Sequence, residues 1–222
     1  MFGPISSIGY DGGETEAIQT RLASCERSVA GSLRARSASL KIVAINPDDL
    51  YRVSREEYLV GELLASARSE WVDGVVYAMA GAAKTHVRAV SRINRLLFDQ
   101  ADERGCLLGS SDLLVETALA FYYPDIVLSC QPSDDPRIEH NPCFIAEVLS
   151  PSTGRVDRHE KRDAYCALAS LQDYWIVDAE TKVIEAWTRG ADGWVASHYS
   201  AAELVRVQCL DLEFRVADIV GA

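Results

Sequence analysis

The chain has 222 residues, 48% of them hydrophobic and 25% charged, which is the composition of a globular protein with one sizeable domain. Its 22 lysines and arginines against 33 aspartates and glutamates leave a formal net charge of −11. Such a charge excludes a protein that coats nucleic acids or membranes through bulk attraction, so any DNA contact needs a local basic patch or bound cations. Since no apolar run approaches the ~20 residues of a membrane span, we expect a soluble, cytoplasmic protein.

The six cysteines are scattered along the chain without a Cys-x-x-Cys pair, which argues against a zinc ribbon or a thioredoxin-like redox motif. Several of them stand inside apolar runs, where a free cysteine packs as a small hydrophobic side chain. The sequence therefore predicts reduced, buried thiols and no disulfide scaffold.

Residues 1–45 differ from the rest of the chain, because they are rich in Gly, Ser, Ala and Arg and show no sustained hydrophobic period. A segment of this kind cannot bury enough apolar area to offset the entropy lost on ordering. We expect a poorly ordered N-terminal extension, followed by one domain over residues 46–222.

The elements of that domain are predicted in chain order. Ser54 and Glu57 form a capping box at the start of a helix, and residues 70–79 indicate a hairpin around Asp73-Gly74. A second helix is predicted over 81–104, with an apolar face made of Val87, Val90, Leu96 and Leu97.

Strand patterns dominate the rest of the domain. They cover residues 106–115, 123–129 and 143–149, then a polar helix is predicted over 156–169. Further strands follow over 174–178, 183–187 and 194–199 and near Phe214, with Asp192-Gly193 as a hairpin turn. This order predicts an α/β fold, a sheet with helices packed against it.

Glu147 is the most informative polar residue, because it lies in the apolar run Cys-Phe-Ile-Ala-Glu-Val-Leu and is expected to be buried. An ionised carboxylate there needs a cation, hydrogen bonds or a metal. Asp125 follows Pro124 at the start of another apolar strand, which places it at a sheet end. If these strands are neighbours, both carboxylates can share a divalent cation, and Lys161 in the next helix supplies a positive charge.

Each of these residues also has a structural interpretation. Glu147 and Lys161 can form a buried ion pair between strand and helix, and Asp125 can bond its own backbone as a turn residue. Glu70 fits a solvated strand face, and His86 fits a surface or capping histidine.

Four cations share one face of the second predicted helix, without an acidic neighbour. They fit either a solvated helix face or a contact with nucleic-acid phosphates. The members of this basic stripe are Lys84, Arg88, Arg92 and Arg95.

From about Val53 to Ile219 the sequence resembles the Uma-type restriction endonucleases, a branch of the PD-(D/E)xK nuclease superfamily. The resemblance runs through EWVDGVVYAMAGA, SDLLVE, YYPDIVLSC, AEVLSPST, RHEKRDAY and DYWIVDAE. Asp125 after its proline and Glu147 match the acidic residues of the superfamily name. The lysine expected two residues later is absent, because Leu149 stands there, and Lys161 in the following helix matches its role. A further acidic residue of the family looks like Glu70, and its histidine looks like His86.

The resemblance implies a restriction-endonuclease-like mixed sheet flanked by helices, with extra C-terminal antiparallel strands. It implies an endonuclease that uses Mg²⁺ or Mn²⁺ to hydrolyse phosphodiester bonds, with DNA as the expected partner. Asp125 and Glu147 would bind the metal and act in catalysis with Lys161 and Glu70. With such a substrate, the charge pattern of the basic stripe favours its contact with nucleic-acid phosphates. Self-association as a homodimer or higher oligomer is also implied.

Two alternatives stay open at the level of the sequence. One is a non-catalytic module that keeps this fold and binds nucleic acid or a protein partner, because fold membership does not guarantee turnover. The other is a structural oligomer in which the carboxylates and Lys161 are only core ion pairs.

Overall fold

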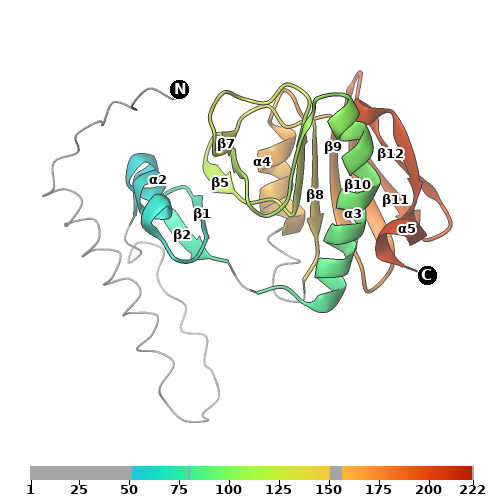
Figure 1. Cartoon of the computed structure of the whole chain (residues 1–222), viewed down its shortest axis with the longest axis horizontal. Helices are drawn as coiled ribbons and strands as arrows, with labels where there is room; N and C mark the ends of the chain where they lie inside the picture. The colour runs from blue at the N-terminus through green and yellow to red at the C-terminus, as the bar shows by residue number, and fades with distance from the viewer. Residues whose placement is uncertain (1–51, 80, 151–156, 222) are drawn as a thin grey trace, which may run out of the picture. The chain divides into compact units, whose positions relative to one another are not determined.

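The computed structural model describes residues 52–79, 81–150 and 157–221 (Figure 1). The predicted N-terminal extension over 1–45 lies outside these ranges, so its order stays a prediction. The chain divides into two compact units, one that ends at Ala78 and one that begins at Met79.

The first unit contains helix α2 (Arg55–Leu64) and a hairpin of β1 (Ser69–Val72) and β2 (Val75–Ala78). The predicted capping box is confirmed, since Glu57 N–H donates to Ser54 Oγ at 3.2 Å and Ser54 N–H donates to Glu57 Oε2 at 3.0 Å. Asp73 and Gly74 have φ of 44° and 89° and form the predicted turn between the strands. Two consecutive residues with positive φ match the twist of a two-residue hairpin.

The second unit begins with the long helix α3 and continues through alternating strands and short helices. Its first half consists of α3 (Lys84–Glu103), β3 (Leu107–Gly109), β4 (Leu114–Glu116), β5 (Ala120–Tyr122), β6 (Ile126–Ser129), β7 (Ile138–Glu139) and β8 (Phe144–Val148). Its second half consists of the π-helical turn η2 (Asp157–Lys161), α4 (Arg162–Cys166), β9 (Asp173–Asp178), β10 (Val183–Gly190), β11 (Gly193–Ser200), β12 (Leu204–Val207), the 3-10 turn η3 (Gln208–Leu210), β13 (Leu212–Arg215) and α5 (Val216–Val220).

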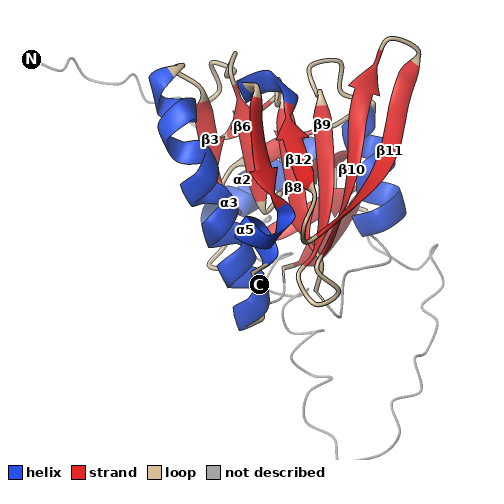
Figure 2. Cartoon of the chain, turned by 90° about the vertical axis from the view of Figure 1, so that its right-hand side faces the viewer, coloured by secondary structure: helices blue, strands red, loops and turns tan. Residues whose placement is uncertain are grey.

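A six-stranded mixed sheet organises this unit, in the order β11-β10-β9-β8-β6-β3 (Figure 2). Strand β8 lies at its centre, parallel to β9 and antiparallel to β6, and all five of its residues are buried. At the C-terminal side, β9, β10 and β11 pair antiparallel, and Gly190 faces Gly193 at the predicted hairpin turn. The predicted α/β class, with a mixed sheet, flanking helices and added antiparallel strands, is confirmed.

The two faces of β8 have different neighbours. Phe144, Ala146 and Val148 belong to the main apolar core together with residues of α3 and α5. Because side chains alternate along a strand, Glu147 points to the other face, where Tyr165 of α4 bonds to it. Helix α4 therefore covers the face of the sheet that carries the predicted acid.

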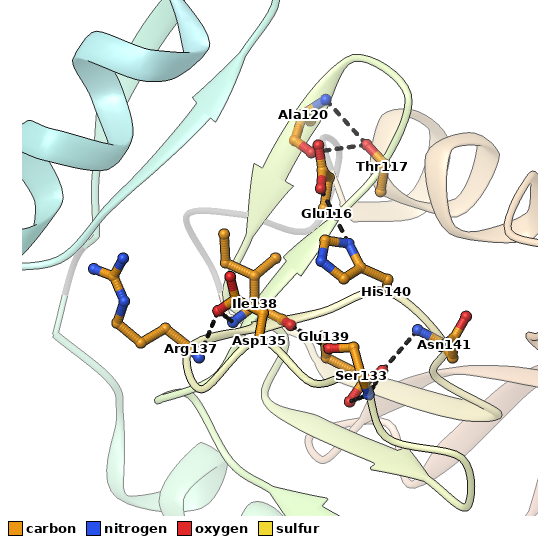
Figure 3. A network of polar contacts seen from close by, with 10 residues as sticks. All are labelled: Glu116, Thr117, Ala120, Ser133, Asp135, Arg137, Ile138, Glu139, His140 and Asn141. Carbon is orange, nitrogen blue, oxygen red and sulfur yellow. Dashed lines mark hydrogen bonds and ion pairs between the residues drawn. The ribbon is translucent and has the colours of Figure 1, made fainter. Parts of the chain in front are cut away.

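The turn-rich segment before β8 is held by side chains that bond to backbone groups (Figure 3). Glu139 is 1% exposed, and its Oε1 accepts from the N–H groups of Ser133 at 3.3 Å and Asn141 at 2.7 Å. His140 Nδ1 lies 3.0 Å from Glu116 Oε2 and links the segment to β4. These bonds order the segment although β7, its only strand among the described residues, is two residues long.

The prediction of reduced thiols is wrong for two of the six cysteines, because Cys106 and Cys130 form a disulfide. The antiparallel register of β3 and β6 pairs Leu107 with Ser129. The residue before Leu107 and the residue after Ser129 are therefore opposite each other, and these are the two cysteines, with Cα atoms 4.0 Å apart. Their separation of 24 residues left no local spacing signal in the sequence. Cys143 is a buried thiol, as predicted, and a hydrogen bond from the Cys209 thiol lowers the pKa of Cys143.

Candidate active site

The two predicted carboxylates lie on neighbouring strands, as the shared-cation hypothesis requires. Asp125 immediately precedes β6, and Glu147 is the fourth residue of β8, which pairs with β6 through Ile126 and Ala146. The N–H of Val148 donates to Asp125 Oδ2 at 2.7 Å. The Asp125 carboxylate is thus fixed to the backbone of β8 at the residue that follows Glu147.

Glu147 is held by two donors from the α4 side of the sheet. Its Oε1 accepts from Lys161 Nζ at 3.2 Å and from the Tyr165 hydroxyl at 3.1 Å. The side chains of Lys161 and Glu147 are only 10% and 5% exposed, so each charge compensates the other away from water. The Lys161 ammonium also lies 5.3 Å from the centroid of the Tyr122 ring, at cation–π distance.

Tyr165 was missed in the sequence, although a signal for it existed. It stands four residues after Lys161, and residues at that spacing share one side of a helix. Its ring packs at 5.4 Å from Tyr122 and 5.5 Å from Tyr174, which fixes the direction of its hydroxyl. A helix that carries the candidate lysine therefore also carries a second donor for the buried acid.

His86 is placed against Asp125, with its Nε2 3.0 Å from Asp125 Oδ2. The two side chains are 13% and 14% exposed, so the interpretation of His86 as a surface or capping histidine is wrong. His86 lies three and seven residues before Ala89 and Ile93, which are both 1% exposed, so it shares the buried side of α3. This spacing is the sequence signal that could have predicted its burial. Together with Val148 N–H, His86 gives Asp125 Oδ2 two polar contacts.

The donor set fits a hard divalent cation bound with an incomplete protein shell. Within the described parts of the chain, only a group of cysteines brings three candidate ligand atoms within 4.8 Å, so Asp125 and Glu147 do not join a third such side chain at that distance. Mg²⁺ typically uses one or two carboxylates and completes its shell with water and substrate phosphate oxygens. The two acids match that pattern. A bound cation would share their oxygens with the Val148, Lys161 and Tyr165 donors.

The remaining predicted site residues are Glu70 and the basic stripe. Glu70 belongs to β1 of the first unit, where it pairs with Tyr77 of β2. The basic stripe lies on α3, where Lys84, Arg88 and Arg95 are exposed. At 3.6 residues per turn these three point to the side opposite His86. The stripe therefore faces away from Asp125.

Arg92, the fourth member of the stripe, is engaged within the protein. Its Nη1 donates to the backbone oxygen of Ile219 at 3.3 Å, near the end of α5. The structure thus uses this guanidinium to join α3 to α5, and the three other cations remain at the surface.

A mixed α/β sheet with two acids at the ends of adjacent strands and a lysine from the following helix defines a restriction-endonuclease-like protein. Residues 55–217 match the model of the Uma2 family, described as "Putative restriction endonuclease", and the chain belongs to this family. The predicted family membership is confirmed.

Two Synechocystis proteins and one solved structure are similar to the chain. The uncharacterised protein slr1290 is 33% identical over 170 residues, which cover 74% of this chain and 90% of the relative. The uncharacterised protein sll1609 is 31% identical over 145 residues, covering 61% and 80%. The crystal structure of a putative nuclease belonging to DUF820 from Anabaena variabilis aligns with a TM-score of 0.59 over 70% of this chain and 91% of that one; at 15% identity it shows the fold alone.

Across the helices that the structure describes, none combines the length and the apolar character needed to cross a membrane.

Proposed function

We propose that this protein is a metal-dependent endonuclease that hydrolyses phosphodiester bonds in DNA. The observation that carries the proposal is the meeting of Asp125, Glu147 and Lys161 at one end of two adjacent strands, where Lys161 lies 3.2 Å from Glu147 and Asp125 bonds to the backbone beside it. Membership of the Uma2 family supports the nuclease assignment.

A Mg²⁺ or Mn²⁺ ion held by Asp125 and Glu147 would polarise the phosphodiester and lower the pKa of a bound water. The protein's own groups prepare this site. His86 and Val148 N–H orient Asp125, and Tyr165 orients Glu147. These contacts fix the direction of both carboxylates before substrate arrives.

Lys161 is the group that acts on the reacting atoms. Its ammonium lies 3.2 Å from the Glu147 carboxylate, and it can donate a hydrogen bond to the attacking water or to the phosphate oxygen on which negative charge develops. Preorganised cationic donors of this kind lower the barrier, because they need no reorganisation during the reaction. Glu70 is proposed as a further acid of the catalytic set.

Plasmid nicking tests the proposal. Supercoiled plasmid is incubated with the protein in Mg²⁺, in Mn²⁺ or in EDTA, and the appearance of the open circle is followed on gels. Wild type should nick only with a divalent cation, and Asp125→Asn and Lys161→Met should each lose at least about 100-fold in rate. The matched controls Glu213→Gln and Lys182→Met change exposed residues and should retain wild-type rates. Equal nicking by wild type and both site variants would refute the assignment.

The second candidate function is a non-catalytic nucleic-acid-binding module. It is favoured by the hydrogen bonds and ion pairs that the described structure already gives both carboxylates. It predicts salt-dependent DNA binding that survives Asp125→Asn and weakens when Arg88 and Arg95 of the basic stripe become Gln, because each lost phosphate contact reduces the salt slope by about 1. Fluorescence anisotropy with a labelled duplex at several salt concentrations distinguishes the two functions.

A further inference from the structure

Four cysteines from different parts of the chain meet at one end of the six-stranded sheet. Cys106 precedes β3, Cys130 follows β6, Cys143 precedes β8 and Cys209 lies in η3. Cys143 Sγ lies 3.9 Å from Cys130 Sγ, and the sulfurs of Cys130, Cys143 and Cys209 all lie within 4.8 Å of one another. Cys106 joins this cysteine cluster through its disulfide with Cys130.

The cysteine cluster is separate from the candidate active site. Cys143 and Glu147 stand at opposite ends of the β8 segment, four residues apart, which corresponds to about 13 Å along an extended strand. The two sites also differ in chemistry, because carboxylate oxygens select hard cations and thiolate sulfurs select soft ones. A metal bound by one site would not be the preferred metal of the other.

The separations among the Cys130, Cys143 and Cys209 sulfurs suit three of the four positions of a tetrahedral thiolate site. A zinc–sulfur bond of about 2.3 Å in tetrahedral geometry places neighbouring sulfurs about 3.8 Å apart, close to the 3.9 Å between Cys130 and Cys143. For Cys106 Sγ to serve as the fourth ligand, its disulfide bond to Cys130 Sγ must first be broken. Reduction of the disulfide by a dithiol or phosphine, with two electrons and two protons, yields two thiols that can move apart to that spacing.

The surroundings supply hydrogen-bond donors to sulfur. A hydrogen bond with the Cys130 backbone helps to lower the pKa of the Cys143 thiol, and such contacts offset the negative charge of a bound thiolate. The Arg104 guanidinium lies 3.5 Å from the Cys209 carbonyl oxygen and adds a nearby positive charge. The Asp173 carboxylate also acts on Cys143 and Cys209 and opposes that effect, although its Oδ2 is already occupied by Gln208 N–H at 2.8 Å.

We propose that the reduced protein binds one thiophilic divalent cation of the zinc type through Cys106, Cys130, Cys143 and Cys209, and that the Cys106–Cys130 disulfide closes this site. Binding displaces one proton from each of the four thiols and leaves a tetrathiolate complex of charge −2. The bound cation ties β3, β6, β8 and η3 together at the end of the sheet opposite the carboxylates.

A Cd²⁺ titration tests the proposal through the ultraviolet charge-transfer absorbance of cadmium–thiolate bonds. The full chain carries Cys25→Ser, so that a cysteine outside the described residues adds no ligand, and is compared after phosphine reduction and in its disulfide form. The reduced protein should bind one Cd²⁺ per chain, and the disulfide form at least tenfold more weakly. Cd²⁺ should also displace Zn²⁺ from the zinc-loaded protein, whereas an excess of Mg²⁺ should leave the absorbance unchanged.

Cysteine variants locate the site. Cys143→Ser and Cys209→Ser should each weaken Cd²⁺ binding at least tenfold, and the matched control Cys166→Ser, which changes a free cysteine outside the cluster, should bind as the parent does. Equal affinity of the reduced and disulfide forms, or no stoichiometric binding by the reduced protein, would overturn the proposal. Because that comparison uses one chain in two redox states, it stands even where a variant fails to fold.

Discussion

Replacing Lys161 by methionine tests how the candidate site is built into the fold. Lys161 Nζ lies 3.2 Å from Glu147 Oε1, and the Glu147 side chain is 5% exposed. Loss of one partner of a buried ion pair costs about 3–5 kcal/mol, because the other charge stays buried without compensation. The Tyr165 hydroxyl remains on the same oxygen, so we expect the lower end, about 3 kcal/mol, which is about 100-fold in the folding equilibrium.

The assay is the free energy of unfolding from urea denaturation at pH 7, for Lys161→Met, for Glu147→Gln and for the double variant. The double variant removes both charges of this buried pair, so it should recover about 2 kcal/mol relative to the sum of the single variants. Lys182→Met, at an exposed turn, should change the stability by less than about 0.5 kcal/mol. Additive penalties, or a Lys161→Met protein as stable as wild type, would refute the reasoning. The double variant should regain stability and remain inactive in plasmid nicking.

Two further predictions concern the corner between α4 and β10. Burial raises the pKa of Cys166 to about 11 from an ordinary 9.0. Its alkylation by iodoacetamide at pH 8, followed by mass spectrometry, should therefore be about 100-fold slower than that of an ordinary thiol. The rate should rise about tenfold per pH unit up to pH 10, and a rate that stops rising by pH 9 would contradict the raised pKa. Arg189 donates to the backbone oxygens of Leu171 at 2.7 Å, Leu168 at 2.7 Å and Cys166 at 3.2 Å. Since lysine cannot reproduce this fork, Arg189→Lys should cost about 2 kcal/mol in urea denaturation, and a loss below about 0.5 kcal/mol would show that one donor suffices.

Features with a local physical signature could be predicted from the sequence. The capping box of Ser54 and Glu57 depends on four consecutive residues, and the Asp73-Gly74 turn depends on two. The burial of Glu147 followed from an apolar run that is typical of a central strand. A polar residue in such a run requires a partner, which is why Lys161 could be assigned to it before the fold was known.

Features that depend on packing between distant segments could not be predicted in the same way. The buried side of α3 consists of Ala89, Ile93, Leu97 and Ala101, and the predicted Val87 is 52% exposed. A prediction of the buried face of α3 from large apolar residues alone is wrong, because two of its four buried residues are alanines. β5, β7, β12 and α5 were absent from the prediction. All four have five residues or fewer, too short to show a period.

Because β8 lies at the centre of the sheet, the two parts of the candidate site, on β8 and on η2 and α4, should open to solvent at different rates. Every residue of β8 is buried between β6 and β9, so its amide protons can exchange with solvent only when the whole sheet opens. Lys161, by contrast, comes from η2 and α4, two helical pieces of five residues each. Opening of these short pieces can withdraw the lysine while Glu147 stays in place. Amide exchange should then be slowest at Glu147 and much faster around Lys161, so the charge balance of the site can change without unfolding the sheet.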